Sequence, residues 1–426
     1  MRYLDYSEAE LKNELAALNG ACEAFRKKGL KLDMSRGVPA KAQLDLSLPM
    51  LTDLQTAEDC ISESGTDYRN YGILDGIPEA KKLFADLLDV KPENVIVCGS
   101  SSLNIMYDTV ARNMLYGVCG SEPWCRLPEV KFLAPVPGYD RHFAVCQSLG
   151  IKLIPVPMTK TGPDMDIVEK LVAEDESIKG IWCVPKFSNP DGTVYSDETV
   201  RRFAGLKAKA KDFRIFWDNA YIIHTLYPDC PEIPNILKEA EKAGNPDIAY
   251  VFTSTSKITF PGAGVAVVAS SDANIAHIKS AMKFQTIGFD KLNQLRHVKF
   301  FKDVDGLKAQ MQKHADILRP KFECVLNAFR KELTGLGIAE WSEPRGGYFI
   351  SLNVLPGTAK RVWDLMVSMG VKLTGAGATF PYGVDPEDKN LRIAPSFPTV
   401  ENLSLAVEAL CLAVRTAAVE KLLADK

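Results

Sequence analysis

The sequence predicts an α/β protein in which a large domain, with a mostly parallel seven-stranded sheet flanked by helices, is joined to a smaller α+β domain. Three observations favour this fold. The chain has 426 residues, which is long for one compact core. Short apolar runs alternate with helical stretches between residues 94 and 270, and long helical stretches dominate beyond residue 300. We therefore expect a large domain over residues 50–300 and a small domain formed by residues 1–49 and 301–426.

The first element that we expect is an amphipathic helix over residues 7–28. Its apolar side chains recur at steps of three and four, at Leu11, Leu15, Leu18, Cys22 and Phe25. Because such an apolar stripe needs a partner surface, we expect this helix to pack on the small domain. A Gly-Pro loop, SRGVPA, comes next, and a polar loop that contains Tyr68 and Tyr71 then leads into a helix beginning at Pro78.

Seven apolar runs predict the strands of the large sheet: NVIVCG, VKFLAP, KLIPVP, IKGIWCVP, FRIFWDNA, IAYVFTS and GVAVVAS. Runs that are apolar on both faces and interleaved with helices are typical of a parallel sheet covered on each side. Beyond residue 300, helices over 302–334 and 358–370 flank the strand GGYFISLNV, and a helix over 400–424 closes the chain. This order predicts an α+β arrangement for the small domain.

Composition restricts the classes of function. The chain is 46% hydrophobic and 25% charged, which is typical of a soluble globular protein. Fifty-one basic and 54 acidic residues give a net charge of -3, and no long Lys/Arg block suggests a nucleic-acid partner. The ten cysteines form no CxxC pair and the five histidines no HxxxH pair, so we expect reduced thiols and no metal site.

The cellular location is predicted from the apolar stretches and from the first residues of the chain. No stretch approaches the roughly 18 uninterrupted apolar residues of a membrane span. The first residues carry acids throughout and therefore do not resemble a signal or transit peptide. We expect a cytoplasmic protein without a membrane partner.

Polar residues follow four of the predicted strands. In VCGSSS, the residues Ser100, Ser101 and Ser102 open a helix, whose free N–H groups suit an anion. A serine N-cap explains the same pattern equally well. Asn189 follows the strand IKGIWCVP in an Asn-Pro-Asp-Gly run, which is also an ordinary turn.

The other two strand ends carry charged side chains. Asp218 emerges from the strand IFWD with Tyr221 three residues later, and a carboxylate at the end of a buried strand must be paired or hydrogen-bonded. Lys257 follows the strand IAYVFTS in the segment STSKITFPGAG. Taken alone, this lysine is either an anchored reactive amine or a lysine at a strand exit.

An amine, a carboxylate, an amide and an anion cradle together meet the chemical demands of pyridoxal 5'-phosphate. The aldehyde of this cofactor forms a Schiff base with a lysine, and its ring nitrogen must stay protonated beside an acid. Its phosphate needs a helix N-terminus. The four strand ends therefore predict pyridoxal phosphate as the cofactor.

These residues resemble the fold-type I pyridoxal-phosphate enzymes, specifically the class I and II aminotransferases, over nearly the whole chain. Tyr71, before GILDGIPEAKK, is similar to the family's tyrosine that reaches the phosphate of the neighbouring subunit's cofactor. Gly37 in SRGVPA resembles the family's substrate-side loop. Tyr139 in PVPGYDRHFA matches the aromatic residue that stacks on the cofactor ring.

The resemblance implies roles for the strand-end residues. Asn189 and Tyr221 would bind the pyridine hydroxyl oxygen, and Asp218 would bind the ring nitrogen. Ser254 would bind the phosphate together with the serines of the VCGSSS segment. Lys257 would be the Schiff-base lysine and then the general base of proton transfer. Catalysis is accordingly assigned to Lys257, Asp218 and Tyr221.

The same resemblance implies the substrate contacts. Arg392 in NLRIAPSFP matches the arginine that clamps the substrate α-carboxylate, where a planar fork is preferred over a point charge. Gly37 and Asn189 would line the same subsite. Most class I members place a phosphate-binding arginine shortly after the lysine, but this chain reads SKITFPGAGVAV there. With GSSSLNIMYD, PGYDRHF and PRGGYF, this departure is most similar to the bacterial type Ic aspartate aminotransferases.

The implied reaction is amino transfer between L-aspartate and 2-oxoglutarate in a ping-pong mechanism, by a homodimer with shared active sites. An acidic substrate needs a second cation, for which Arg36, Arg141 and Arg345 are candidates; each is equally explained as an exposed arginine. The alternatives are an aminotransferase or C–S lyase acting on another amino acid, or a non-catalytic regulatory module that binds the cofactor. The last is disfavoured because only about 30 residues precede SRGVPA, without a basic helix-turn-helix pattern.

Overall fold

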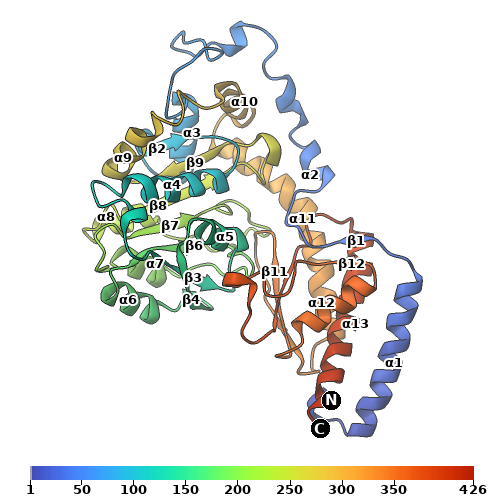
Figure 1. Ribbon diagram of the computed structural model, residues 1–426. Coiled ribbons are helices and arrows are strands. Elements are labelled where there is room, and N and C mark those ends of the chain that lie inside the picture. Colours follow the sequence, from blue (N-terminus) through green and yellow to red (C-terminus); the bar gives the residue numbers. More distant parts are fainter. Residues whose placement is uncertain (1) are drawn as a thin grey trace.

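The computed structural model describes residues 2–426. Figure 1 shows a large sheet with helices on both sides, and beside it a second group of helices with short strands. The large sheet has eight strands in the order β2-β9-β8-β7-β6-β3-β4-β5. Their bounds are β2 (Val95–Val97), β3 (Lys131–Val136), β4 (Lys152–Thr159), β5 (Gly162–Pro163), β6 (Ile178–Cys183), β7 (Arg214–Asp218), β8 (Ala249–Ser254) and β9 (Ala266–Ala269).

The α/β prediction is confirmed, and the seven predicted strands are all present. The sheet differs from the prediction in an eighth strand, β5, which has two residues and pairs antiparallel with the end of β4. The four central pairings, from β4 through β3, β6 and β7 to β8, are parallel. Only β9 interrupts this direction on the other side, because it pairs antiparallel with both β8 and β2.

Helices cover both faces of the sheet. One face packs against α3 (Pro78–Leu88), α6 (Met165–Glu174), α7 (Asp197–Ala204), α8 (Ile236–Lys242) and α10 (Lys291–Phe301). The other packs against α4 (Ser102–Tyr116), α5 (Asp140–Ser148) and α9 (Asp272–Met282). Within β7, Ile215 and Trp217 enter the first core and Phe216 the second, as the alternation of strand side chains requires. This double cover explains why the strands read as continuous apolar runs.

The second group of elements has its own sheet and core. Strands β10 (Ala339–Trp341), β11 (Ile350–Val354) and β13 (Asn390–Ile393) form an antiparallel sheet, and β1 (Leu32–Asp33) pairs with β12 (Val371–Lys372). The helices are α1 (Glu8–Lys27), α2 (Lys41–Asp45), α11 (Val304–Glu332), α12 (Ala359–Ser368) and α13 (Val400–Ala424). Short 3-10 turns lie at Tyr3–Asp5, Leu48–Thr52, Glu58–Cys60, Pro92–Asn94, Trp124–Arg126, Pro261–Ala263 and Pro381–Gly383.

The N-terminal helix α1 packs as its apolar stripe predicts. Leu11, Leu18, Cys22 and Phe25 are buried in the same core as α13, and the Cys22 sulfur lies 3.6 Å from the Thr416 hydroxyl. Of the described helices, α13 alone is long and apolar enough to cross a membrane, yet 72% of its apolar stretch is buried inside the protein. The division of the chain into domains at residues 50 and 300 stays a prediction.

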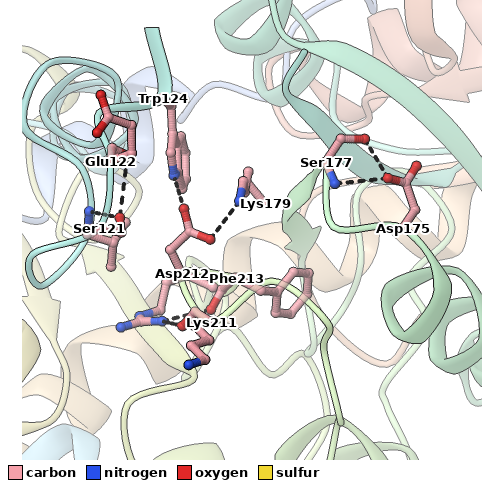
Figure 2. A network of polar contacts seen from close by, with 11 residues as sticks. Ser121, Glu122, Trp124, Asp175, Ser177, Lys179, Lys211, Asp212 and Phe213 are labelled. Atoms are coloured by element: carbon pink, nitrogen blue, oxygen red, sulfur yellow. Dashed lines mark hydrogen bonds and ion pairs between the residues drawn. The ribbon is translucent and has the colours of Figure 1, made fainter. Parts of the chain in front are cut away.

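A buried polar network joins the amino ends of β6 and β7. The Lys179 ammonium lies 2.7 Å from Asp212 Oδ1, and the indole N–H of Trp124 donates to Asp212 Oδ2 at 2.8 Å. Figure 2 shows these three side chains pointing toward one another. All three residues are buried, so the pair is a fixed internal contact rather than a surface ion pair. It lies at the opposite end of β7 from Asp218.

Candidate active site

Most of the strand-end residues meet at one cavity of about 360 Å3, whereas Ser100, Ser101 and Ser254 do not line it. It lies where β6, β7 and β8 end, next to the start of α4 and to the second sheet. The predicted residues that line it are Gly37, Ser102, Tyr139, Asn189, Asp218, Tyr221, Lys257 and Arg392. The carboxyl ends of parallel strands share one edge of a sheet, which explains why residues so far apart in sequence converge.

Asp218 is the last residue of β7 and is buried. One carboxylate oxygen, Oδ2, lies 3.0 Å from Nε2 of His142 on α5, and the His142 ring stacks on Trp182 at 4.4 Å between centroids. The other oxygen, Oδ1, is buried and has no hydrogen-bond partner among residues 2–426. Since buried polar atoms are almost always paired, this oxygen marks a place for a donor that the chain itself does not supply.

Lys257 lies in the loop three residues after β8. Its ammonium nitrogen is 5.1 Å from the ring centre of Tyr221 and 5.8 Å from that of Tyr348. Burial lowers the pKa of Lys257, and the Arg392 charge lowers it further, while the Asp218 carboxylate raises it. The neutral amine, which is the nucleophilic form, is therefore more accessible than in an exposed lysine.

A chain of polar side chains holds the backbone of this loop. The Tyr348 hydroxyl donates to the Lys257 carbonyl at 3.4 Å and accepts from Gln43 Nε2 at 2.9 Å. The same Gln43 amide lies 3.0 Å from Nδ1 of His314. Lys257 is thus anchored by residues from α2 and α11 as well as by its own strand.

Two loops approach each other closely beside Lys257. The Ser254 hydroxyl donates to Ser256, and the Ser256 hydroxyl donates to the Ser100 carbonyl, both at 3.1 Å. A side chain at Gly264 would put its Cβ 2.7 Å from the same Ser100 oxygen, so only glycine allows this approach. The loop after β8 is thereby held against the segment that leads into α4.

The three serines that open α4 differ in their contacts. Ser101 is the N-cap of α4, and its hydroxyl accepts a hydrogen bond from the Asn104 N–H at 3.5 Å. Ser102 lines the cavity, whereas Ser100 and Ser101 do not line it. The capping interpretation therefore describes Ser101, and an anion-binding role for Ser100, Ser101, Ser102 and Ser254 stays a prediction.

Arg392 in β13 is buried on the side of the cavity opposite the large sheet. Its Nη1 donates to Asp140 Oδ1 at 2.7 Å and to Asn189 Oδ1 at 3.4 Å. The guanidinium carbon lies 5.0 Å above the ring of Phe349. A Cβ at Gly37 would lie 2.3 Å from that ring, so the loop requires glycine there. The Arg392 Nε has no partner in the described chain.

Two tyrosines supply hydroxyl groups that stay protonated. Burial, then the negative charges of Asp218 and Asp140, raise the pKa of Tyr139 to about 12. Burial raises the pKa of Tyr221 well above its ordinary value of 10.0. Both are therefore hydrogen-bond donors at neutral pH.

The three arginines proposed for a distal carboxylate are separated by the fold. Arg36 and Arg141 line the cavity. Arg345 does not; it forms an ion pair with Asp229, and its guanidinium lies 4.1 Å from the ring centre of Tyr227. The surface interpretation therefore holds for Arg345. Tyr71 does not line the cavity of its own chain and is 85% exposed.

Sequence reasoning missed Asp140, His142, Tyr348 and Phe349. A signal was present for His142, because PGYDRHF opens a helix directly after β3 and residues three apart on a helix share a face. Tyr139 and His142 have this spacing, with 4.9 Å between their rings. Tyr348 and Phe349 come from the second sheet, and nothing in the local sequence relates them to the cavity.

Comparison with known proteins identifies the class. The chain belongs to the aspartate amino-transferase family, whose model matches residues 6–426. A relative from Mycolicibacterium smegmatis, named as an aminotransferase, is 49% identical over 402 residues, or 94% of each chain. An aspartate aminotransferase of Corynebacterium glutamicum is 45% identical over 404 residues, covering 93% of this chain and 92% of the relative.

A solved structure agrees with the sequence comparison. The crystal structure of an aspartate transaminase from Corynebacterium glutamicum superposes with a TM-score of 0.96 at 43% identity, covering 99% of each chain. The resemblance to bacterial aspartate aminotransferases and the fold-type I architecture are thereby confirmed. Membership of this family implies dependence on pyridoxal phosphate.

Proposed function

We propose that the protein catalyses reversible transfer of an amino group between L-aspartate and 2-oxoglutarate, with pyridoxal phosphate bound in the cavity of Lys257 and Asp218. The observation that carries the proposal is that one cavity holds both an amine with a lowered pKa and a carboxylate oxygen without a partner. The aspartate aminotransferase relatives support this choice of reaction.

The residues present fit the cofactor. The unpaired Oδ1 of Asp218 suits a protonated ring nitrogen, and the Lys257 amine suits the aldehyde. Ser102, Ser254 and the N-terminus of α4 suit the phosphate through neutral donors, without the arginine that most class I members use. Bound in this way, pyridoxal phosphate supplies an electron sink for the electrons released at the substrate α-carbon.

The chain supplies binding and proton movement. Arg392 binds the substrate α-carboxylate, which takes the place of Asp140 on the guanidinium. Lys257 would act as the general base that moves the proton from the substrate α-carbon to the aldehyde carbon of the cofactor. Tyr221 and Asn189 would donate to the ring hydroxyl oxygen of the bound cofactor, and Tyr139 would cover the flat face of its ring.

Two arginines at the cavity support a substrate with a second carboxylate. Arg36 and Arg141 are both exposed at the lining, so either can reach a distal carboxylate without the penalty of a buried charge. Replacing the responsible arginine with methionine should raise KM for aspartate and leave KM for alanine unchanged. An equal change for both amino donors, in both variants, would contradict an acidic substrate.

The decisive experiment removes the amine. Lys257→Ala should abolish transamination between aspartate and 2-oxoglutarate and the absorbance of the lysine-bound cofactor. Lys207→Ala, at an exposed lysine, is the matched control and should keep both. Full turnover by the Lys257→Ala protein would refute the proposal. Initial rates at several concentrations of both substrates should give the parallel lines of a ping-pong mechanism.

We also propose that the protein is a homodimer in which Tyr71 completes the neighbouring site. Large apolar side chains are exposed around α4 and after α9, at Tyr107, Leu115, Tyr116, Phe284 and Ile287. Three of them, Leu115, Tyr116 and Phe284, line one hollow of the surface, and exposed apolar side chains that gather in this way favour a protein interface. Sedimentation should give twice the chain mass of 46.9 kDa.

Mixing two inactive variants tests the shared site. Lys257→Ala and Tyr71→Ala proteins are unfolded together and refolded. If Tyr71 serves its neighbour, half of the random dimers are hybrids with one intact site of two, so about one quarter of wild-type activity returns. Activity no higher than that of the separate variants would exclude a shared site.

Location and partners follow from the same class of protein. All ten cysteines are free thiols, as expected for a reducing compartment. We propose a cytoplasmic enzyme whose partners are amino acids, 2-oxo acids and a second copy of the chain, without a nucleic-acid or membrane partner.

A further inference from the structure

A second cavity, of about 510 Å3, lies beside the first but shares none of its lining residues. The segments at the ends of β6 and β7 contribute lining residues to both cavities. After β6, Lys186 lines the second cavity and Asn189 the first; after β7, Asn219 lines the second and Asp218 the first. From this arrangement we propose that the second cavity is a binding site for a small carboxylic acid with an aliphatic body.

The anchor of this site is Lys186. The residue is 2% exposed, and its side-chain nitrogen lies 3.0 Å from Glu232 Oε2. The Glu232 side chain is 86% exposed, so this partner remains solvated at the end of a surface segment. A buried ammonium needs an anion close to it. Because Glu232 loses little by returning to water, a ligand carboxylate can take its place on Lys186.

Asn219 adds a second polar group. It is 7% exposed, and its Oδ1 has no hydrogen-bond partner in the described chain. The amide oxygen is therefore not held in place by a hydrogen bond. Rotating it by half a turn presents its NH2 donors instead, which suits a carboxylate held on Lys186.

One part of the cavity wall fits an aliphatic body, beside the polar residues Thr225, Lys308 and Gln312. Leu87, Ile222, Ile223, Val304 and Met311 contribute to its wall. Apolar walls with a few placed polar groups are typical of small-molecule sites.

Acidic groups at this cavity do not oppose an anion. Asp86 pairs with Lys82 at 2.8 Å, and Asp89 pairs with Lys238 at 2.5 Å. Glu232 is the remaining acid of the lining, and it is the one that the ligand displaces.

Calorimetric titration of hexanoate into the enzyme loaded with pyridoxal phosphate tests the site. Saturating maleate is present throughout, so that Arg392 and the first cavity are already filled. We expect one saturable site per chain, and no binding of hexylamine, which has the same body without the negative charge. Lys186→Met should weaken hexanoate binding at least tenfold, while Lys207→Met, an exposed control, should leave it unchanged.

Replacing Glu232, the exposed partner of Lys186, should change the affinity for hexanoate in the opposite direction. Glu232→Gln removes the competing carboxylate and should tighten hexanoate binding several-fold, which is a result that a folding defect cannot produce. Absence of saturable binding to the wild type, or equal affinity in the wild type and Glu232→Gln, would overturn the proposal. These titrations measure no turnover, so they stand independently of the proposed reaction.

Discussion

Two buried aspartates lie near the two ends of β7, and they have opposite environments. Asp212, before the strand, has both oxygens satisfied, one by Lys179 and one by the Trp124 indole. Asp218, at the end of the strand, has one oxygen on His142 and one oxygen without a partner. The hydrogen bonding of the aspartate is therefore complete at one end of β7 and incomplete at the other.

The difference distinguishes a structural carboxylate from one kept for chemistry. A fully paired buried acid holds its neighbours in place, and removing it exposes their unsatisfied groups. A partly paired acid reduces stability unless a ligand completes it, and such groups persist where function needs them.

The largest effect on stability is expected at the structural end. Asp212→Asn leaves the Lys179 charge buried without a counter-charge, so the free energy of unfolding should fall by about 3–5 kcal/mol. Activity per folded molecule should not change, because Asp212 does not line the active-site cavity. Urea unfolding followed by circular dichroism, with kcat of the folded fraction, measures both quantities.

A double variant checks the cause. Replacing both partners, as Lys179→Met with Asp212→Leu, removes the isolated charge and should lose less stability than the two single changes added together. Strict additivity would show that Lys179 and Asp212 are not coupled in the folded protein.

The largest effect on catalysis is expected at the other end of the same strand. Asp218→Asn keeps the shape but cannot stabilise a positive charge, so kcat should fall by about 10²–10³-fold, the range for losing one electrostatic contact in an active site. The free energy of unfolding of the apoenzyme should be unchanged or higher. A loss of stability as large as that of Asp212→Asn would contradict the contrast between the two aspartates.

The sequence predicts those parts of this contrast between Asp212 and Asp218 that depend on neighbouring residues in the chain. It does not predict contacts between elements that are distant in the chain. The apolar runs predict β7 and place Asp218 at the edge where Asn189 and Lys257 also lie. This was possible because an apolar run and the residue that ends it can both be recognised in a short stretch of sequence. Nothing local reveals that Lys179 reaches Asp212 or that His142 reaches Asp218, since both contacts join separate elements. The strand β5 was missed for a similar reason, because its two residues are extended only through pairing with β4.

The arginines show the same limit. Arg36, Arg141 and Arg345 are equivalent in the sequence, and only the fold places the first two at the cavity and pairs Arg345 with Asp229. Tyr71 illustrates a further limit, since its predicted partner belongs to another chain. Predicted roles of single side chains therefore depend on packing that strand and helix patterns do not contain.

A smaller effect is expected at the ion pair that the substrate must open. Asp140 occupies Arg392 at 2.7 Å, and unlike Asp212 its side chain is partly exposed. Asp140→Asn removes this competition, so binding of succinate to the enzyme should tighten by up to about tenfold, or roughly 1.4 kcal/mol. Difference absorbance of the bound cofactor measures the dissociation constant. Weaker binding would show that Asp140 holds Arg392 in position instead of competing for it.

The smallest effect concerns the amine itself, in the apoenzyme. Burial lowers the pKa of Lys257 below its ordinary value of 10.5, so between these two pKa values the unfolded chain binds more protons than the folded chain. The free energy of unfolding of the wild type should therefore rise with pH through this interval. Lys257→Met keeps the length of the side chain without the charge, so it should be the more stable protein at pH 7.

That advantage should shrink as the pH approaches 10. Urea unfolding of both apoproteins at pH 7, 8, 9 and 10 measures the difference. A difference in the free energy of unfolding that stays constant with pH would mean that Lys257 titrates as an ordinary exposed lysine. Burial of its amine at the end of β8 would then not lower the stability of the apoenzyme.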